Sequence, residues 1–155
     1  MSPDRRKQAA DALWSDANSA AEQAEAIAAI AQRLKFRPKK LAVLPVERKT
    51  QYLLGLFSVP EVVAARLLVS YHIAHQRPLM SAFLDALGVP HDNGLIAEGT
   101  DIKPDTEKTR AAVQAISASF PAEDVALYLS TLSWQDSETW ADLPDLPETQ
   151  GPSKA

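Results

Sequence analysis

The residues of this chain best suited to chemistry are its three histidines, which all lie between positions 72 and 91. His72 and His75 are three residues apart, so on a helix they share a face and can chelate a divalent metal ion. His91 and Asp92 lie in a later loop and can complete a coordination shell. The sequence therefore predicts a candidate metal or small-molecule site formed by His72, His75, His91 and Asp92.

A structural role is the competing interpretation of the same side chains. His72 and His75 fall in the last turn of an expected helix, where imidazole groups bond to free carbonyls and interact favourably with the helix dipole. His91 opens a run of Asp, Asn and Gly, the residue types of a tight turn. No HExxH motif is present. The sequence favours the structural role, and we expect no cofactor.

Features typical of an enzyme are absent from the sequence. The chain has no Cys, which excludes a thiolate nucleophile, a disulfide framework and a cysteine-bound metal. It has no Ser/His/Asp order, no nucleophile elbow and no phosphate-binding glycine loop. Seven of the acidic residues are expected in the first turns of helices, where the dipole favours them. The composition therefore favours a non-catalytic protein.

Arg66 is the one cation inside a strongly apolar stretch. No acidic residue lies three or four positions from it on the same helix, so its partner must come from another element unless its head reaches solvent. We expect a structural ion pair, with Asp85 as the partner.

The net charge of -4 is unevenly distributed along the chain. Residues 1–50 carry a net charge of +4, residues 51–100 carry -2 and residues 101–155 carry -6. Seven Lys and Arg residues against one acid fall between positions 33 and 49, and Phe36 is available there for stacking on a base. Nucleic-acid binding through residues 33–49 is thus a third hypothesis, which the overall pI of about 5.3 disfavours.

The backbone expected to position these residues is helical. The chain has 11 Pro and only 5 Gly, a composition that disfavours turn-rich β folds and suits prolines at the first turns of helices. We predict an all-α fold of about seven to eight helices from these starts and from the hydrophobic periodicity. The expected helices cover residues 3–17, 19–36, 38–44, 46–57, 59–76, 78–87, 105–118 and 121–134.

Two features of this arrangement bear on packing. An Ala-rich seam from Ala10 to Leu34 is compatible with one long helix, whereas the turn-forming residues 15–19 and a capping box formed by Ser19 and Glu22 favour a helical hairpin. The sequence leaves both open. The helix near 59–76 is apolar on nearly every side, so we expect it to be the buried central helix against which the N-terminal region packs.

The remaining segments complete the expected organisation. We predict one helical domain over residues 1–143 and a mobile tail over residues 144–155. The connection 88–104 is long for a compact domain and holds three of the five glycines, which favours a functional role. We expect no secretory signal and a cytoplasmic location, and the apolar stretch 62–74 is too short to span a membrane.

Together these observations favour a helical protein-interaction domain. The Ala-rich seam and the sparsely charged middle third suggest contacts either with another protein or with a second copy of the chain. The alternative is a small-molecule or metal site formed by the helix end at 72–75 and the 88–104 connection.

Overall fold

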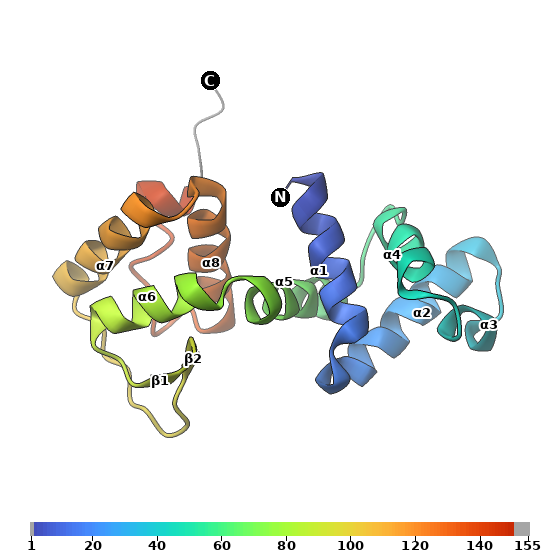
Figure 1. Cartoon of the computed structure of the whole chain (residues 1–155), viewed down its shortest axis with the longest axis horizontal. Coiled ribbons are helices and arrows are strands. Elements are labelled where there is room, and N and C mark those ends of the chain that lie inside the picture. Colours follow the sequence, from blue (N-terminus) through green and yellow to red (C-terminus); the bar gives the residue numbers. More distant parts are fainter. Residues whose placement is uncertain (1, 151–155) are drawn as a thin grey trace. The chain divides into compact units, whose positions relative to one another are not determined.

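The computed structural model describes residues 2–150, and it confirms the predicted all-α class (Figure 1). The eight α-helices of this part are α1 (Pro3–Ser15), α2 (Ala20–Leu34), α3 (Pro38–Ala42), α4 (Val46–Leu54), α5 (Glu61–His75), α6 (Arg77–Leu87), α7 (Thr106–Ser119) and α8 (Ala122–Gln135). A short 3-10 turn, η1 (Ala17–Ser19), lies between α1 and α2, and a small antiparallel hairpin, β1 (His91–Asp92) with β2 (Leu95–Ile96), lies between α6 and α7. A second 3-10 turn, η2 (Pro147–Gln150), follows α8.

Proline marks the helix starts, as the sequence predicted. Six of the eight helices begin within one residue of a proline: α1, α3, α4, α5, α6 and α8. A proline costs nothing there because its missing N–H has no intrahelical partner. The seventh helix, α7, begins instead with Asp105 as N-cap, whose side chain accepts the N–H of Glu107 at 3.1 Å.

The chain divides into two compact units, residues 1–75 and 76–155, where a single domain over 1–143 was expected. Each unit has its own hydrophobic core. The buried cluster of unit 1 runs from Ala10 to Val63, and that of unit 2 runs from Leu79 to Leu143. Hydrophobic periodicity shows that a helix face is buried but not which partner buries it, so the division was not visible in the sequence.

The Ala-rich N-terminal region is two helices, not one. The chain leaves α1 at Asp16, whose side chain accepts the N–H of Asn18 at 2.9 Å and the hydroxyl of Ser19 at 2.7 Å. The Gln23 amide donates to the carbonyls of Leu13 (2.8 Å) and Asp16 (3.0 Å), so it satisfies acceptors that the end of a helix leaves open. The capping box expected from Ser19 does not form, because this hydroxyl binds Asp16 instead.

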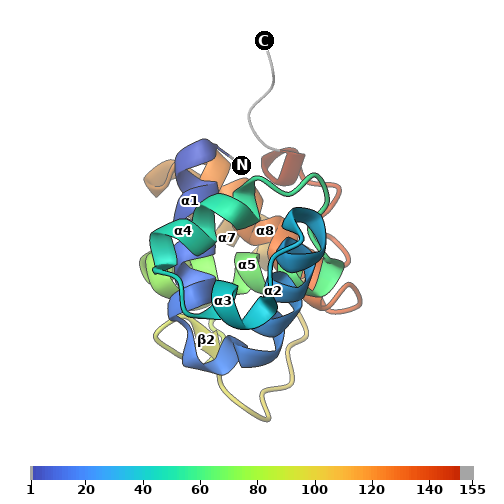
Figure 2. The ribbon, with the colours of Figure 1, turned by 90° about the vertical axis from the view of Figure 1, so that its right-hand side faces the viewer.

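Helix α5 lies at the centre of unit 1, as expected, because both α1 and α2 pack against it. It is less buried than its composition suggested. Val63, Ser70, Tyr71 and His72 are buried, whereas Val62 at its start is exposed. Helices α3 and α4 complete the unit by packing against α2 and against α1 respectively; Figure 2 looks onto α2, α3 and α4.

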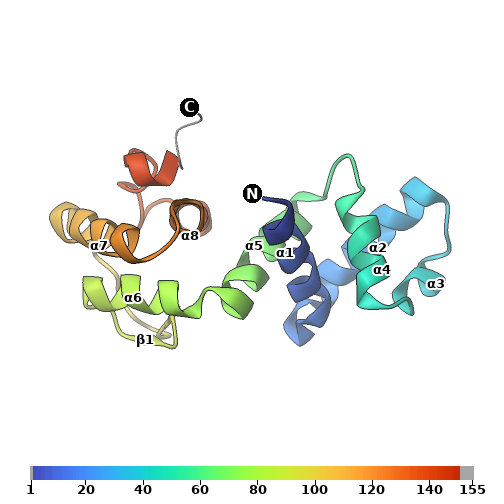
Figure 3. The ribbon, with the colours of Figure 1, turned by 45° about the horizontal axis from the view of Figure 1, so that its top comes forward.

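In unit 2, α6 and α7 lie side by side and α8 packs against α7 (Figure 3). The segment after α8 belongs to this core, since Trp140 and Leu143 are buried in it and η2 packs on α8. Residues 144–150, which belong to the predicted mobile tail, contact this core: Leu146 packs against it, and the Thr149 hydroxyl donates to the Leu143 carbonyl. The rest of that tail, 151–155, lies outside the described residues.

Candidate functional site

His72 and His75, the first two predicted ligands, lie in the last turn of α5, in unit 1. The His72 ring is buried, and its Nδ1 lies 2.7 Å from the Leu68 carbonyl, so Nδ1 carries the proton and donates. His75 is exposed. Both imidazoles lie against the Tyr71 ring, with centroids 5.3 and 5.7 Å away. These are structural contacts, but the Leu68 carbonyl lies within α5 and is not one of the free carbonyls at the helix end that the sequence favoured.

His91 and Asp92, the other two predicted ligands, form strand β1 in unit 2. His91 Nδ1 accepts the Gly94 N–H at 3.0 Å, so Nε2 carries the proton and donates to Asp85 Oδ1 at 2.6 Å. Nδ1 thus binds within the hairpin turn, and Nε2 holds the hairpin against α6. The Asp92 side chain is exposed on the other side of the strand pleat.

Within residues 2–150, no group of three or more His, Asp or Glu side chains is arranged to hold a metal ion. The structure brings His72 together with His75, and His91 together with Asp85, but each pair is explained by contacts inside its own unit. The predicted four-residue constellation gains no support from this geometry.

Arg66 makes the expected structural ion pair, but its partner is Asp16 and not Asp85. Its guanidinium donates to Asp16 Oδ2 at 2.9 Å and to the Ser19 hydroxyl at 2.7 Å. The Ser70 hydroxyl lies 3.3 Å from the same carboxylate. The Ser19 hydroxyl, the Asn18 N–H and the Arg66 charge together hold the pKa of Asp16 below its usual value. The partner was missed because it lies 50 residues away in sequence.

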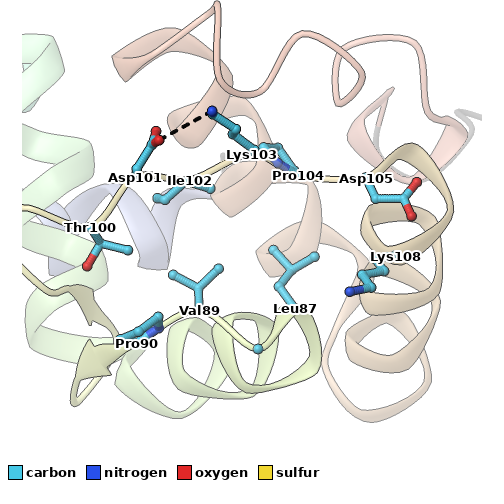
Figure 4. A pocket seen from close by; sticks show the side chains of 11 residues that line it. Leu87, Val89, Pro90, Thr100, Asp101, Ile102, Lys103, Pro104, Asp105 and Lys108 are labelled. Atoms are coloured by element: carbon cyan, nitrogen blue, oxygen red, sulfur yellow. Dashed lines mark ion pairs between the residues drawn. The ribbon is translucent and has the colours of Figure 1, made fainter.

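The long connection 88–104 forms one wall of a small pocket of about 210 Å³ in unit 2. Figure 4 shows Leu87 and Val89 on one side and Ile102 on the other. Lys103 pairs with Asp101 at 3.5 Å, and Asp105 caps α7, so most charges at the pocket are already used within the protein. None of the four predicted ligands lines it. A small-molecule site at the connection therefore stays a prediction.

The basic segment 33–49 lies on the surface of unit 1, at the end of α2 and along α3 and α4. Its seven cations form no ion pair with any residue in the described part of the chain. Lys49 lies over the Trp14 ring, 4.9 Å from its centroid. Phe36 contacts the edge of Tyr52, with ring centroids 6.2 Å apart, which joins the end of α2 to α4.

Large apolar side chains are exposed among these cations, which the sequence did not predict. Of the nine large hydrophobic residues exposed in the described chain, seven fall between positions 34 and 62. Phe57 is 94% exposed and Val43 is 83% exposed. We call this region the 33–62 surface. Its apolar members are Leu34, Phe36, Val43, Val46, Leu54, Phe57 and Val62, and its cations are Arg33, Lys35, Arg37, Lys39, Lys40, Arg48 and Lys49.

Three grooves open on unit 1, and each combines apolar walls with cations. One, of about 360 Å³, lies between α1, α4 and α5, with Arg6 as its charged residue. A second, of about 410 Å³, lies between α2 and the segment 56–60, with Arg33. A third, of about 370 Å³, includes Trp14, Lys39 and Lys49. No Asp or Glu lines any of the three.

The available comparisons add no further identification. Comparison with models of protein families, with curated proteins and with solved structures found no match to this chain. Among the described residues, no helix has both the length and the apolar character needed to cross a bilayer.

Proposed function

We propose that this chain is a non-catalytic protein-interaction module and that the 33–62 surface of unit 1 is where it binds. The single observation that carries this proposal is the concentration of exposed large apolar side chains there, seven of the nine in the described chain. Single exposed hydrophobic residues are ordinary, but a gathering of them on one part of a protein is typical of an interaction site.

The placement of Phe57 supports the same proposal. It follows α4 in the segment that separates two of the grooves, and Leu56 beside it lines both of them. An aromatic side chain that is 94% exposed contributes nothing to its own core, so its burial by a partner would be a net gain. Aromatic residues of this kind are frequent anchors of protein interfaces.

The test is photo-crosslinking in the cells from which the chain comes. A photoreactive benzoylphenylalanine is placed at Phe57 of the full chain, and adducts are identified by mass spectrometry. The matched control carries the same group at Trp134, an exposed aromatic residue of unit 2. We expect a discrete protein adduct from position 57 that is absent from position 134. No adduct at 57, or the same adducts at both positions, would contradict the proposal.

A further inference from the structure

The charge of unit 1 defines the chemistry of its partner. Residues 1–75 hold 11 Lys and Arg against 7 Asp and Glu, while residues 76–155 hold 5 against 13. The excess positive charge of unit 1 lies in the range of the 33–62 surface, where seven cations without an ion pair in the described chain outnumber two exposed acids, Glu47 and Glu61, beside the exposed apolar groups. We propose, on the basis of the function proposed above, that the partner is an acidic amphipathic helix of another protein.

The grooves favour a helix over an extended strand. An extended peptide binds by adding to a sheet edge, and the described part of unit 1 contains no strand. Clefts between packed helices instead accept the apolar face of another helix, with side chains spaced three or four residues apart. The groove between α1, α4 and α5 offers Leu53, Leu54, Leu67 and Leu68 to such side chains.

The cations would meet the carboxylates on the flanks of that helix. Arg6 and Arg33 line the two grooves that meet at Leu56, and Lys39 and Lys49 line the third. No Asp or Glu lines these grooves, so a carboxylate placed in one of them would be attracted by the cations and would meet no like charge. Complementary charge of this kind raises the association rate and selects the partner.

The same observations disfavour three other occupants. A second copy that docked its own 33–62 surface against this one would place cation against cation, which costs free energy. A nucleic acid would be held at its phosphates by the cations but would leave aliphatic groups such as Val43 and Leu54 unused. A bilayer would cover Phe57, yet it cannot enter recesses between helices as side chains can.

The inference can be tested on the full chain with defined fluorescent peptides. The probe is an 18-residue helical peptide with Leu at helical spacing and Glu elsewhere, and its matched controls are the same peptide with Lys for Glu and a scrambled acidic peptide. We expect only the acidic helical peptide to bind, measured by fluorescence anisotropy. We also expect its affinity to fall as salt is raised, since surface charges are screened.

Charge-reversal variants test whether binding depends on the cations, as it should for an acidic partner, or only on apolar contacts. Arg6→Glu with Arg33→Glu should weaken binding about tenfold, as expected when two exposed charge pairs become repulsive. Lys108→Glu with Arg110→Glu, the same charge change in unit 2, should leave it unchanged. Circular dichroism checks that all variants remain helical. Phe57→Ser should weaken binding at every salt concentration, because it removes an apolar contact.

The outcomes distinguish this inference from the proposed function. If Phe57→Ser weakens binding but charge reversal and salt do not, the acidic partner is wrong and the interaction role stands. If no peptide binds, the acidic helix is wrong, whatever adduct forms at position 57. Phe57-dependent binding of a 20-nucleotide single strand, of phosphatidylserine vesicles or of a second copy in sedimentation, in place of the acidic peptide, would equally overturn the inference.

Discussion

At the scale of single residues, the most consequential side chain is Asp16. It ends α1, shapes the turn into α2 and receives Arg66 from α5, so one carboxylate joins three helices of unit 1. Both partners of the ion pair are partly exposed, with side-chain exposures of 25% for Arg66 and 21% for Asp16. Removing one partner is therefore expected to cost less free energy of unfolding than in a fully buried pair and more than in a surface pair.

We predict that Asp16→Asn destabilises unit 1 by about 1–2 kcal/mol at neutral pH, because it weakens charge-assisted hydrogen bonds to Arg66 and Ser19. The measurement is urea unfolding followed by circular dichroism. Glu25→Gln removes a carboxylate from the exposed side of α2 and is the control, with an expected change below about 0.5 kcal/mol. Equal stability of the two variants would contradict the role assigned to Asp16.

The lowered pKa of Asp16 gives this residue a pH signature. Because its pKa in the folded state lies below the ordinary value of 3.8, its stabilisation is complete well above pH 3.8. That stabilisation is lost as the pH falls through the lower folded-state value. We predict that the free energies of unfolding of the native chain and Asp16→Asn differ at pH 6 and converge below pH 3.8. A constant difference across this range would be inconsistent with the shift.

At the scale of elements, the hairpin 91–96 is held by contacts made from its turn and first strand. Asn93 and Gly94 have positive φ angles of 48° and 90°, which suits a two-residue hairpin turn. Arg77 donates to the Asn93 carbonyl at 3.0 Å, and His91 bonds to Asp85. His91, which the sequence placed among the candidate ligands, therefore serves to attach the hairpin to α6.

Gly94 and Gly99 form a matched pair for testing this attachment. Both have positive φ, but a Cβ at Gly94 would lie 2.7 Å from the Met80 Cβ, whereas Gly99 has open space around it. We predict that Gly99→Ala costs about 1 kcal/mol for its backbone alone. Gly94→Ala should cost about 1–3 kcal/mol more because of the overlap. Urea unfolding of unit 2 gives both values, and equal losses would contradict the close packing on α6.

The segment after α8 provides a second prediction at this scale. Trp140 is 3% exposed in the core of unit 2, whereas Trp134 at the end of α8 is 52% exposed. We predict that Trp140→Ala destabilises unit 2 by about 3–5 kcal/mol, as for other large core residues. Trp134→Ala should change stability by less than about 0.5 kcal/mol. Thermal unfolding distinguishes them, and a mild effect of Trp140→Ala would mean that this segment is only loosely attached.

At the scale of the whole molecule, the two units have separate cores and opposite net charges. The positive unit carries the exposed apolar side chains that we assign to partner binding, and the negative unit carries the long connection. The net charge of the whole chain, -4, does not show that the two units have net charges of opposite sign.

We predict that the two units lose stability independently. In hydrogen exchange followed by mass spectrometry, Asp16→Asn should speed exchange in α1, α2 and α5 and leave α7 and α8 unchanged. Trp140→Ala should speed exchange in α7 and α8 and leave α1, α2 and α5 unchanged. The reason is that each substitution disturbs contacts inside one core only. Faster exchange throughout the chain in either variant would show a single cooperative unit.

The sequence by itself determined most of the helices and close to where they begin and end, although it left open whether the N-terminal region is one helix or two. Proline at helix starts, Gly88 with a φ of 71° at the end of α6 and turn residues at 15–19 act within a few positions, so they can be identified without the fold.

Only the tertiary structure decided which residues meet and which stay uncovered. It paired Arg66 with Asp16 instead of Asp85, divided the chain into two cores, packed Leu146 of the predicted tail against the core of unit 2 and left Phe57 exposed. Local signals depend on neighbours along the chain. Burial and long-range pairing depend instead on how helix faces are matched across unit 1 and unit 2, which a single sequence does not specify.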